Sequence, residues 1–244
     1  MQNSSAGRIE VHAHLLPGID DGCQTLEEAI ECARRLVVRG YSHCFCTPHI
    51  WSNLPHNNIE QITRRTADLQ AELDRAGIPL RLLGGGELNL RADVQLMPRE
   101  QIVTYGNSRR HVLIDMWIDR LVPHVEPAIR WLQGLGLTVI LAHPERMRAI
   151  QTDPGLADWF SDLGVLFQGN FQCFADPPEA STRRVAEQFL LEGRYFALGS
   201  DLHGVESLRV RFAGMDRVRE LVDDRTYDRL TIENPRKLIP QELR

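Results

Sequence analysis

The sequence predicts an α/β fold in which parallel strands, joined by crossover helices, form a barrel. Short apolar runs alternate with amphipathic runs along the chain, and this alternation favours a parallel sheet. Seven strands with crossover helices within 244 residues suggest a barrel, or a barrel missing one unit. An open, doubly wound sheet shows the same alternation and is the alternative architecture.

Seven segments bounded by turn residues are expected to be strands, and several of them are rich in β-branched or aromatic residues. They are Arg8–His14, His43–Pro48, Leu80–Glu87, His111–Trp117, Thr138–His143, Val165–Asn170 and Tyr195–Ser200. The segment Arg91–Arg110 has no clear period and is expected to be a loop with a short helix.

Helical spacing of apolar residues predicts the helices between these strands. Thr25 is a suitable N-cap for the first helix, Glu28 stands at the capping-box position, and Gly40 suits the end of that helix. Gly77 ends the second helix in the same way. The predicted helices are Leu26–Arg39, Asn58–Ala76, Val125–Leu135, Ser181–Glu192 and Ser207–Val222.

Composition excludes several classes of function. The formal net charge is −5, whereas nucleic-acid-binding proteins usually carry an excess of basic residues. No apolar run approaches the roughly 18 residues of a membrane span, and the first residues, MQNSSAGR, have no apolar core of the kind a secretory signal needs. Five unevenly spaced cysteines fit a reducing cytoplasm better than a disulfide scaffold.

Imidazole and carboxylate side chains stand at or just beyond the carboxyl ends of five predicted strands. They are His12, His14 and Asp21 for the first strand, His49 for the second, Glu87 for the third, His143 for the fifth, and Asp201 and His203 for the seventh. The carboxyl ends of parallel strands gather at one mouth, where active sites form. Each motif alone has a simpler explanation, such as a turn or a helix cap. Together they predict a metal centre.

The ligand types and charges indicate which metals and substrates suit this centre. Imidazole and carboxylate without thiolate suit zinc, manganese or iron in multi-metal hydrolytic sites. Asp21, Glu87 and Asp201 would repel one another without cations, and carboxylates such as Glu87 and Asp201 can bridge two ions. Three bound divalent ions would leave an excess of positive charge, which attracts a phosphate dianion.

The ordered blocks HAH, DDG, TPH, GGE, AHPER and SDLH resemble the polymerase-and-histidinol-phosphatase (PHP) superfamily. They are most similar to the bacterial PHP-type protein tyrosine phosphatases of capsule and exopolysaccharide loci, and the match runs from His12 to ENPRKLI at 233–239. The resemblance implies one PHP domain over residues 1–244, a distorted seven-stranded (β/α) barrel and a trinuclear metal site. The implied ligands are His12, His14, Asp21, His49, Glu87, His143, Asp201 and His203.

The resemblance also assigns roles to residues beside the ligands. Arg146 matches a family arginine that holds the phosphate, and Arg209 is the nearest match to a second such arginine, although its spacing from the DLH block differs by about one residue. The family usually has aspartate two residues before the first histidine. Glu10 occupies that position here, which leaves its role open.

The implied function is a metal-dependent protein tyrosine phosphatase that acts on the tyrosine-rich tail of a bacterial tyrosine autokinase. Hydroxide formed on two ions would attack phosphorus, while a third ion and Arg146 neutralise the phosphoryl oxygens. His203 or Asp201 would assist proton transfer. Three ions are expected, manganese first, with iron or zinc as alternatives. Trp51, in the loop after His49, either stacks on the phosphotyrosine ring or packs in the core.

Two other functions use the same motifs. A PHP phosphatase of small phosphomonoesters, such as histidinol phosphate or a nucleotide, would have the same metals behind a different pocket mouth. A non-catalytic metal-containing module would bind polymerase or kinase partners. A thiolate mechanism is excluded, because none of the five cysteines has the required arginine six residues later. Asp-x-Asp and Walker motifs are also absent from the sequence, so hydroxide and not a protein nucleophile is the expected attacker. The sequence makes no prediction of the oligomeric state.

Overall fold

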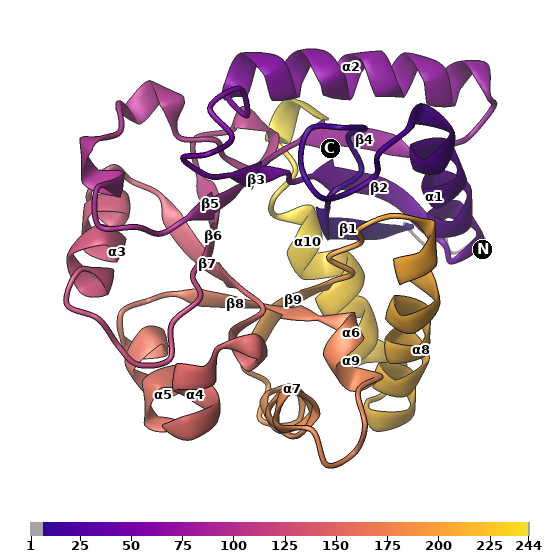
Figure 1. Ribbon diagram of the computed structural model, residues 1–244. Helices are drawn as coiled ribbons and strands as arrows, with labels where there is room; N and C mark the ends of the chain where they lie inside the picture. The colour runs from indigo at the N-terminus through magenta and orange to yellow at the C-terminus, as the bar shows by residue number, and fades with distance from the viewer. Residues whose placement is uncertain (1–6, 244) are drawn as a thin grey trace.

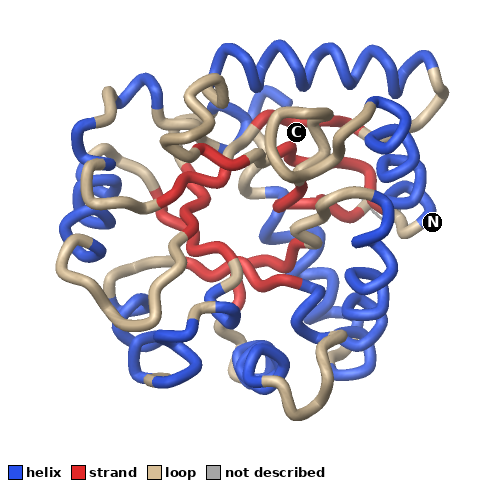
Figure 2. The backbone as a smooth tube through the Cα atoms, in the orientation of Figure 1, coloured by secondary structure: helices blue, strands red, loops and turns tan. Residues whose placement is uncertain are grey.

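The computed structural model describes residues 7–243. Its strands form a ring at the centre of the molecule, and the helices surround this ring (Figures 1 and 2). The ring consists of two parallel sheets, with strand orders β1-β2-β4 and β3-β5-β6-β7-β8-β9. The predicted α/β fold with parallel strands is therefore confirmed. In these residues no helix combines the length and the apolar character that crossing a bilayer requires.

In residues 7–243, seven of the nine strands correspond to the seven predicted segments, with ends that differ by at most three residues. The strands are β1 (Arg8–Ala13), β2 (Tyr41–Cys46), β3 (His49–Ile50), β4 (Arg81–Gly84), β5 (Glu87–Asn89), β6 (His111–Asp115), β7 (Thr138–Ala142), β8 (Leu166–Asn170) and β9 (Tyr195–Gly199).

The structure has two more strands than predicted, β3 and β5, because the chain leaves the sheet ladder just before each of them. β2 ends at Cys46 and β3 begins at His49, after Pro48, which has no backbone N–H for a ladder. The predicted strand Leu80–Glu87 breaks at Gly85 and Gly86, and a Cβ at Gly86 would lie 2.8 Å from an Ile50 side-chain carbon. The short strands β3 and β5 pair with each other and belong to the six-stranded sheet, where His49 lies opposite Glu87.

The ring closes between β1 and β9 through backbone contacts and one buried carboxylate. The Asp201 amide donates to the His12 carbonyl at 2.7 Å, and the His14 amide donates to the Leu202 carbonyl at 3.0 Å. Glu10 Oε1 accepts from the amides of His12 and Ser200, both at 2.9 Å. Burial raises the pKa of Glu10 to about 7 although these amides lower it. Glu10 thus joins the first strand to the segment after the last one.

The five predicted helices are present, with ends that differ by at most two residues. They are α1 (Leu26–Val38), α2 (Ile59–Arg75), α3 (Val125–Gly134), α7 (Ser181–Leu191) and α8 (Val205–Leu221). Thr25 caps α1 by accepting from the Glu28 amide. The short helices α4 (Arg148–Thr152), α5 (Gly155–Asp162), α6 (Phe171–Phe174), α9 (Asp224–Asp228) and α10 (Asn234–Arg236) were not predicted.

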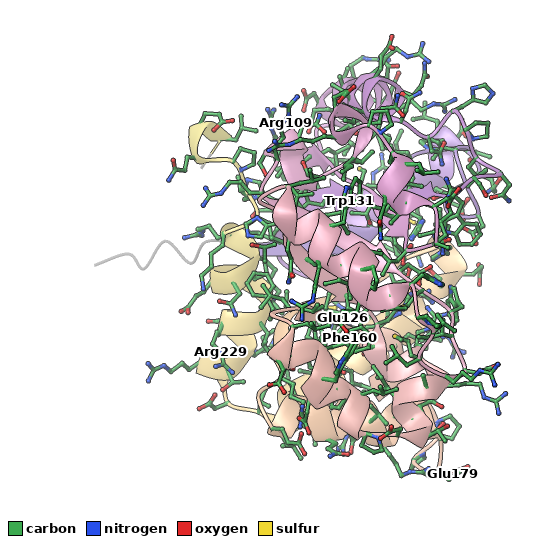
Figure 3. All side chains as sticks on the ribbon, turned by 90° about the vertical axis from the view of Figure 1, so that its left-hand side faces the viewer. Arg109, Glu126, Trp131, Phe160, Glu179 and Arg229 are labelled. Carbon is green, nitrogen blue, oxygen red and sulfur yellow. The ribbon has the colours of Figure 1, made fainter. Side chains whose placement is uncertain are left out.

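Two apolar clusters stabilise this arrangement. The larger cluster fills the space between strands and helices, and Figure 3 shows its α3 and α5 side, with Trp131 above Phe160. The smaller cluster includes Leu113 and Ile140, which alternate with members of the larger cluster along their strands and so face the inside of the ring. Because apolar side chains fill the inside of the ring, the predicted ligands can gather only at its mouth, the end where the strands finish.

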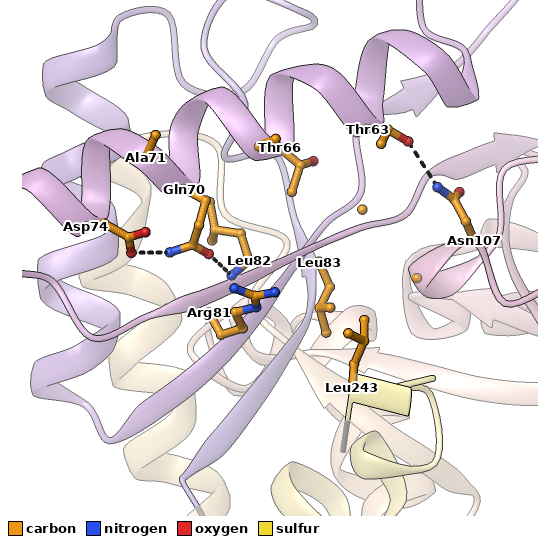
Figure 4. A pocket seen from close by; sticks show the side chains of 13 residues that line it. Thr63, Thr66, Gln70, Ala71, Asp74, Arg81, Leu82, Leu83, Asn107 and Leu243 are labelled. Carbon is orange, nitrogen blue, oxygen red and sulfur yellow. Dashed lines mark hydrogen bonds between the residues drawn. The ribbon is translucent and has the colours of Figure 1, made fainter. Parts of the chain in front are cut away.

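The segment Arg91–Arg110 forms a loop with three 3₁₀ turns, Val94–Leu96, Arg99–Gln101 and Tyr105–Asn107, as the sequence indicated. Beside this loop, α2 lies along β4, the edge strand of the three-stranded sheet (Figure 4). Gln70 accepts from the Leu82 amide at 2.7 Å and donates to the Leu80 carbonyl. Its side chain therefore occupies backbone groups that an edge strand would leave unpaired. A groove of about 370 Å³ lies beside this contact.

Candidate metal centre

All eight predicted ligand side chains meet in one cluster at the carboxyl ends of the strands. Glu87, which begins β5, is at its centre. Glu87 Oε2 lies 2.8 Å from His49 Nδ1 and 3.4 Å from the Nε2 atoms of both His12 and His14. Glu87 Oε1 lies 3.0 Å from His143 Nε2. One fully buried carboxylate therefore touches four imidazoles.

Asp201 is the second carboxylate of the cluster. Its Oδ1 lies 3.4–3.5 Å from nitrogen atoms of His12, His14 and His203. Asp201 and His143 both adopt positive φ angles, 51° and 34°, just after β9 and β7. Such backbone is strained for a residue other than glycine, and it persists where surrounding contacts determine it, often at functional sites.

Asp21 forms the outer side of the cluster. Its Oδ1 lies 3.3 Å from His49 Nε2 and 3.4 Å from His203 Nε2. The Asp21 side chain is 64% exposed, whereas those of His12, His14, Glu87 and Asp201 are almost fully buried. The cluster is thus open to solvent on the Asp21 and His203 side.

One carboxylate of the cluster, Asp115, was not predicted as a ligand. It ends β6, and both of its oxygens are buried without a hydrogen-bond partner. Burial and the nearby charge of Glu87 raise the pKa of Asp115 to about 6. The available signal was a single acidic residue at the end of the apolar run HVLID.

The donor groups fit divalent cations. Three sets of donor atoms lie within 4.8 Å of one another: His14, Asp21, His49 and His203; His12, His14 and Glu87; and His49, Glu87 and Asp115. Besides the Asp115 oxygens, Glu87 Oε2 and His49 Nδ1 are buried without a hydrogen bond, although they lie 2.8 Å apart. Buried polar atoms without partners are costly. Cations would supply the missing partners.

Two further residues orient the imidazoles. Gln168 Oε1 lies 2.7 Å from His12 Nδ1, and Asp20 Oδ2 lies 2.7 Å from His14 Nδ1. These contacts leave the Nε2 atoms of His12 and His14 facing the cluster, as is usual when an outer carboxylate or amide fixes a metal-binding histidine. Neither residue was predicted to have a role at the site.

Three arginines lie in or near the segments that form the mouth. Arg146 Nη1 donates to Asp201 Oδ2 at 2.8 Å. Arg211 is buried and donates to the backbone carbonyl of Asp201. Arg209 is exposed on α8, and no hydrogen bond or ion pair found within residues 7–243 joins it to the cluster. Its assignment to phosphate binding stays a prediction.

The Glu87–His143 pair predicts how the stability of the metal-free protein depends on pH. Burial lowers the pKa of His143, but the hydrogen bond and charge of Glu87 raise it from 6.5 to about 9. Because the folded pKa is the higher one, the pair stabilises the fold fully below pH 6.5, and this contribution is lost as the pH rises through 9. The melting temperature of chelator-treated protein should therefore fall across this range. Glu87→Gln should abolish most of the fall, and a flat wild-type profile would contradict the pairing.

Comparison with known proteins identifies the family. The model of the family described as capsular polysaccharide synthesis, CpsB/CapC, matches residues 8–240. The chain belongs to this family. The resemblance of its motifs to proteins of capsule loci is thereby confirmed.

Individual CpsB/CapC proteins align over most of the chain. The tyrosine-protein phosphatase YwqE of Bacillus subtilis is 30% identical over 205 residues, which cover 82% of this chain and 78% of YwqE. The tyrosine-protein phosphatase CpsB of Streptococcus pneumoniae is 21% identical over 242 residues, covering 96% and 99% of the two chains.

Solved structures share the fold. A chain from crystal structures of YwqE and CpsB, described as metal-dependent tyrosine phosphatases, superposes with a TM-score of 0.85 at 24% identity and covers 94% of this chain and 93% of its own. A TatD homologue from Escherichia coli has a TM-score of 0.52 at 15% identity, with coverage of 96% and 98%. The CpsB/CapC chain therefore has the architecture of these parallel α/β proteins.

Proposed function

We propose that this CpsB/CapC protein is a metal-dependent phosphomonoester hydrolase that removes phosphate from phosphotyrosine in proteins. The observation that carries the proposal is a cluster of four carboxylates and five imidazoles beside one arginine, Arg146. The cluster lies in a chain whose relatives are named tyrosine-protein phosphatases. The fold would be the distorted seven-stranded PHP barrel if β2 with β3, and β4 with β5, are each counted as one broken strand.

Three ions are expected at this cluster, with the eight predicted ligands and Asp115 as the residues that would hold them. The three donor sets support this expectation for six of those ligands and for Asp115, and Asp201 and His143 lie beside the sets. Manganese is the expected metal, with iron or zinc as alternatives. Ions bound there would lower the pKa of a water molecule and neutralise charge on the phosphoryl oxygens.

The protein's own groups would bind the substrate and move protons. Arg146, held by Asp201 at the edge of the cluster, presents N–H donors suited to phosphate oxygens. Burial and the neighbouring His14 lower the pKa of His203, which favours the neutral imidazole that binds a metal ion. His203 or Asp201 would assist proton transfer only as far as their binding of an ion allows. The phenolate of tyrosine leaves without strong acid assistance because the parent pKa is about 10.

The expected protein substrate is the tyrosine-rich tail of a tyrosine autokinase in capsule or exopolysaccharide regulation, with both proteins in the cytoplasm. Membership of a capsular polysaccharide synthesis family supports this partner. A flexible tail would also suit a cluster that opens to solvent beside Asp21 and His203.

Purified protein supplied with manganese should hydrolyse p-nitrophenyl phosphate and a phosphotyrosine peptide. Chelation should abolish both activities, and added manganese should restore them. Metal analysis of the same sample should find close to three ions per chain.

The same assay separates the alternative functions. A higher kcat/KM for histidinol phosphate or a nucleotide than for the peptide would replace the protein substrate by a small molecule. Tight metal binding without hydrolysis of any phosphomonoester would favour a non-catalytic module and would contradict the proposed function.

A further inference from the structure

Trp117 is an exposed aromatic residue at the edge of the metal centre. It follows Asp115, the last residue of β6, by two positions, and it is 56% exposed. The other three tryptophans, Trp51, Trp131 and Trp159, are all less exposed. A single exposed apolar ring is common on a protein surface, so the position of Trp117 beside the cluster, and not its exposure alone, indicates a function.

The indole of Trp117 contacts two residues of the segment that follows the neighbouring strand β7. The guanidinium carbon of Arg146 lies over the indole, 4.7 Å from the ring centroid. The His143 ring is 5.7 Å away, at an interplanar angle of 34°. Trp117 therefore adjoins both a candidate metal ligand and the arginine that would hold the phosphate.

Trp51, the other candidate for stacking on the substrate, already packs against His49. Its ring stacks on His49, with centroids 4.0 Å apart and an angle of 29°, and its Nε1 is buried. This contact fits a role in packing against a ligand. Trp117 retains the larger free ring surface.

We propose that Trp117 selects aryl phosphates by stacking its indole against the phenyl ring of phosphotyrosine. This inference rests on the proposed phosphatase function. In an aryl phosphate a single ester oxygen separates phosphorus from the ring, so a phosphate bound at Arg146 places the ring within reach of Trp117. Aromatic pairs contribute beyond their buried area. A phosphoserine or another alkyl phosphate has no ring to stack, and so gains nothing from this surface.

The test compares kcat/KM for two peptides of one sequence that carry phosphotyrosine or phosphoserine. In manganese-loaded Trp117→Ala, the ratio of the two values should fall about tenfold, mainly through KM for phosphotyrosine. Trp117→Phe should keep most of the preference. Leu121→Ala is the matched control, because Leu121 is another apolar residue of the same loop and is 38% exposed. This variant should leave the ratio unchanged. Metal content should match the wild type in each variant.

Direct binding gives a second readout. Calorimetry should show that the wild type binds phenylphosphonate more tightly than methylphosphonate, and that Trp117→Ala loses this difference. Equal losses on both peptides would mean that Trp117 only positions Arg146, and an unchanged ratio would mean that it has no part in selection; either result overturns the inference. Wild-type protein inactive on every phosphomonoester would instead refute the proposed function, and this inference with it.

Discussion

Glu87→Gln should reduce kcat for a phosphotyrosine peptide by about three orders of magnitude, because metal ions supply several kcal/mol of transition-state stabilisation. Glu87 contacts four imidazoles and belongs to two of the three donor sets. A neutral amide cannot bridge two cations as a carboxylate does. The variant should also retain fewer ions per chain after dialysis.

Steady-state kinetics and metal analysis on the same preparation check this expectation. Glu60→Gln, an exposed position in the first turn of α2, removes the same charge away from the cluster and should retain wild-type activity. A Glu87→Gln protein with full activity and full metal content would show that Glu87 does not bridge ions.

Asp115→Leu should change stability in opposite directions with and without metal. Asp115 is a fully buried carboxylate whose two oxygens have no hydrogen-bond partner, so an apolar side chain of similar size should raise the melting temperature of the metal-free chain. The same change leaves Glu87 as the only carboxylate in the donor set of His49, Glu87 and Asp115. Manganese should therefore stabilise the variant much less than it stabilises the wild type. Activity should fall about 100-fold or more.

Thermal melts with chelator and with manganese measure both effects. Asp119→Leu, on the exposed loop after β6, serves as the matched control and should alter neither melt by much. If Asp115→Leu lowered the melting temperature without metal and still bound the wild-type number of ions, Asp115 would be a structural residue.

The sequence predicted the strands and longer helices because their signals are local. Apolar periodicity and terminal residues such as Thr25 and Gly40 act over one helix or strand. The interruption at Gly85 and Gly86 was not visible in this way, since it depends on the close approach of Ile50 to Gly86. That contact joins residues 36 positions apart and exists only in the folded chain.

The candidate site divides along the same line. The eight predicted ligands fall in short blocks of polar residues at strand ends, which can be read locally. Asp115 and Gln168 each stand alone between non-polar residues and not in a block of polar ones. What marks them is tertiary: Asp115 lacks a hydrogen-bond partner, and Gln168 contacts His12 from 156 positions away.

The broken strands have a consequence for how the protein responds to metal supply. His12 belongs to the three-stranded sheet, whereas His49, Glu87 and Asp115 belong to the six-stranded one. Ions bound between them would cross-link the two halves of the ring, so part of the binding energy would become folding energy. Metal starvation would then shorten the lifetime of the protein as well as reduce its catalytic rate. Metal-free molecules would be degraded more readily than metal-bound ones.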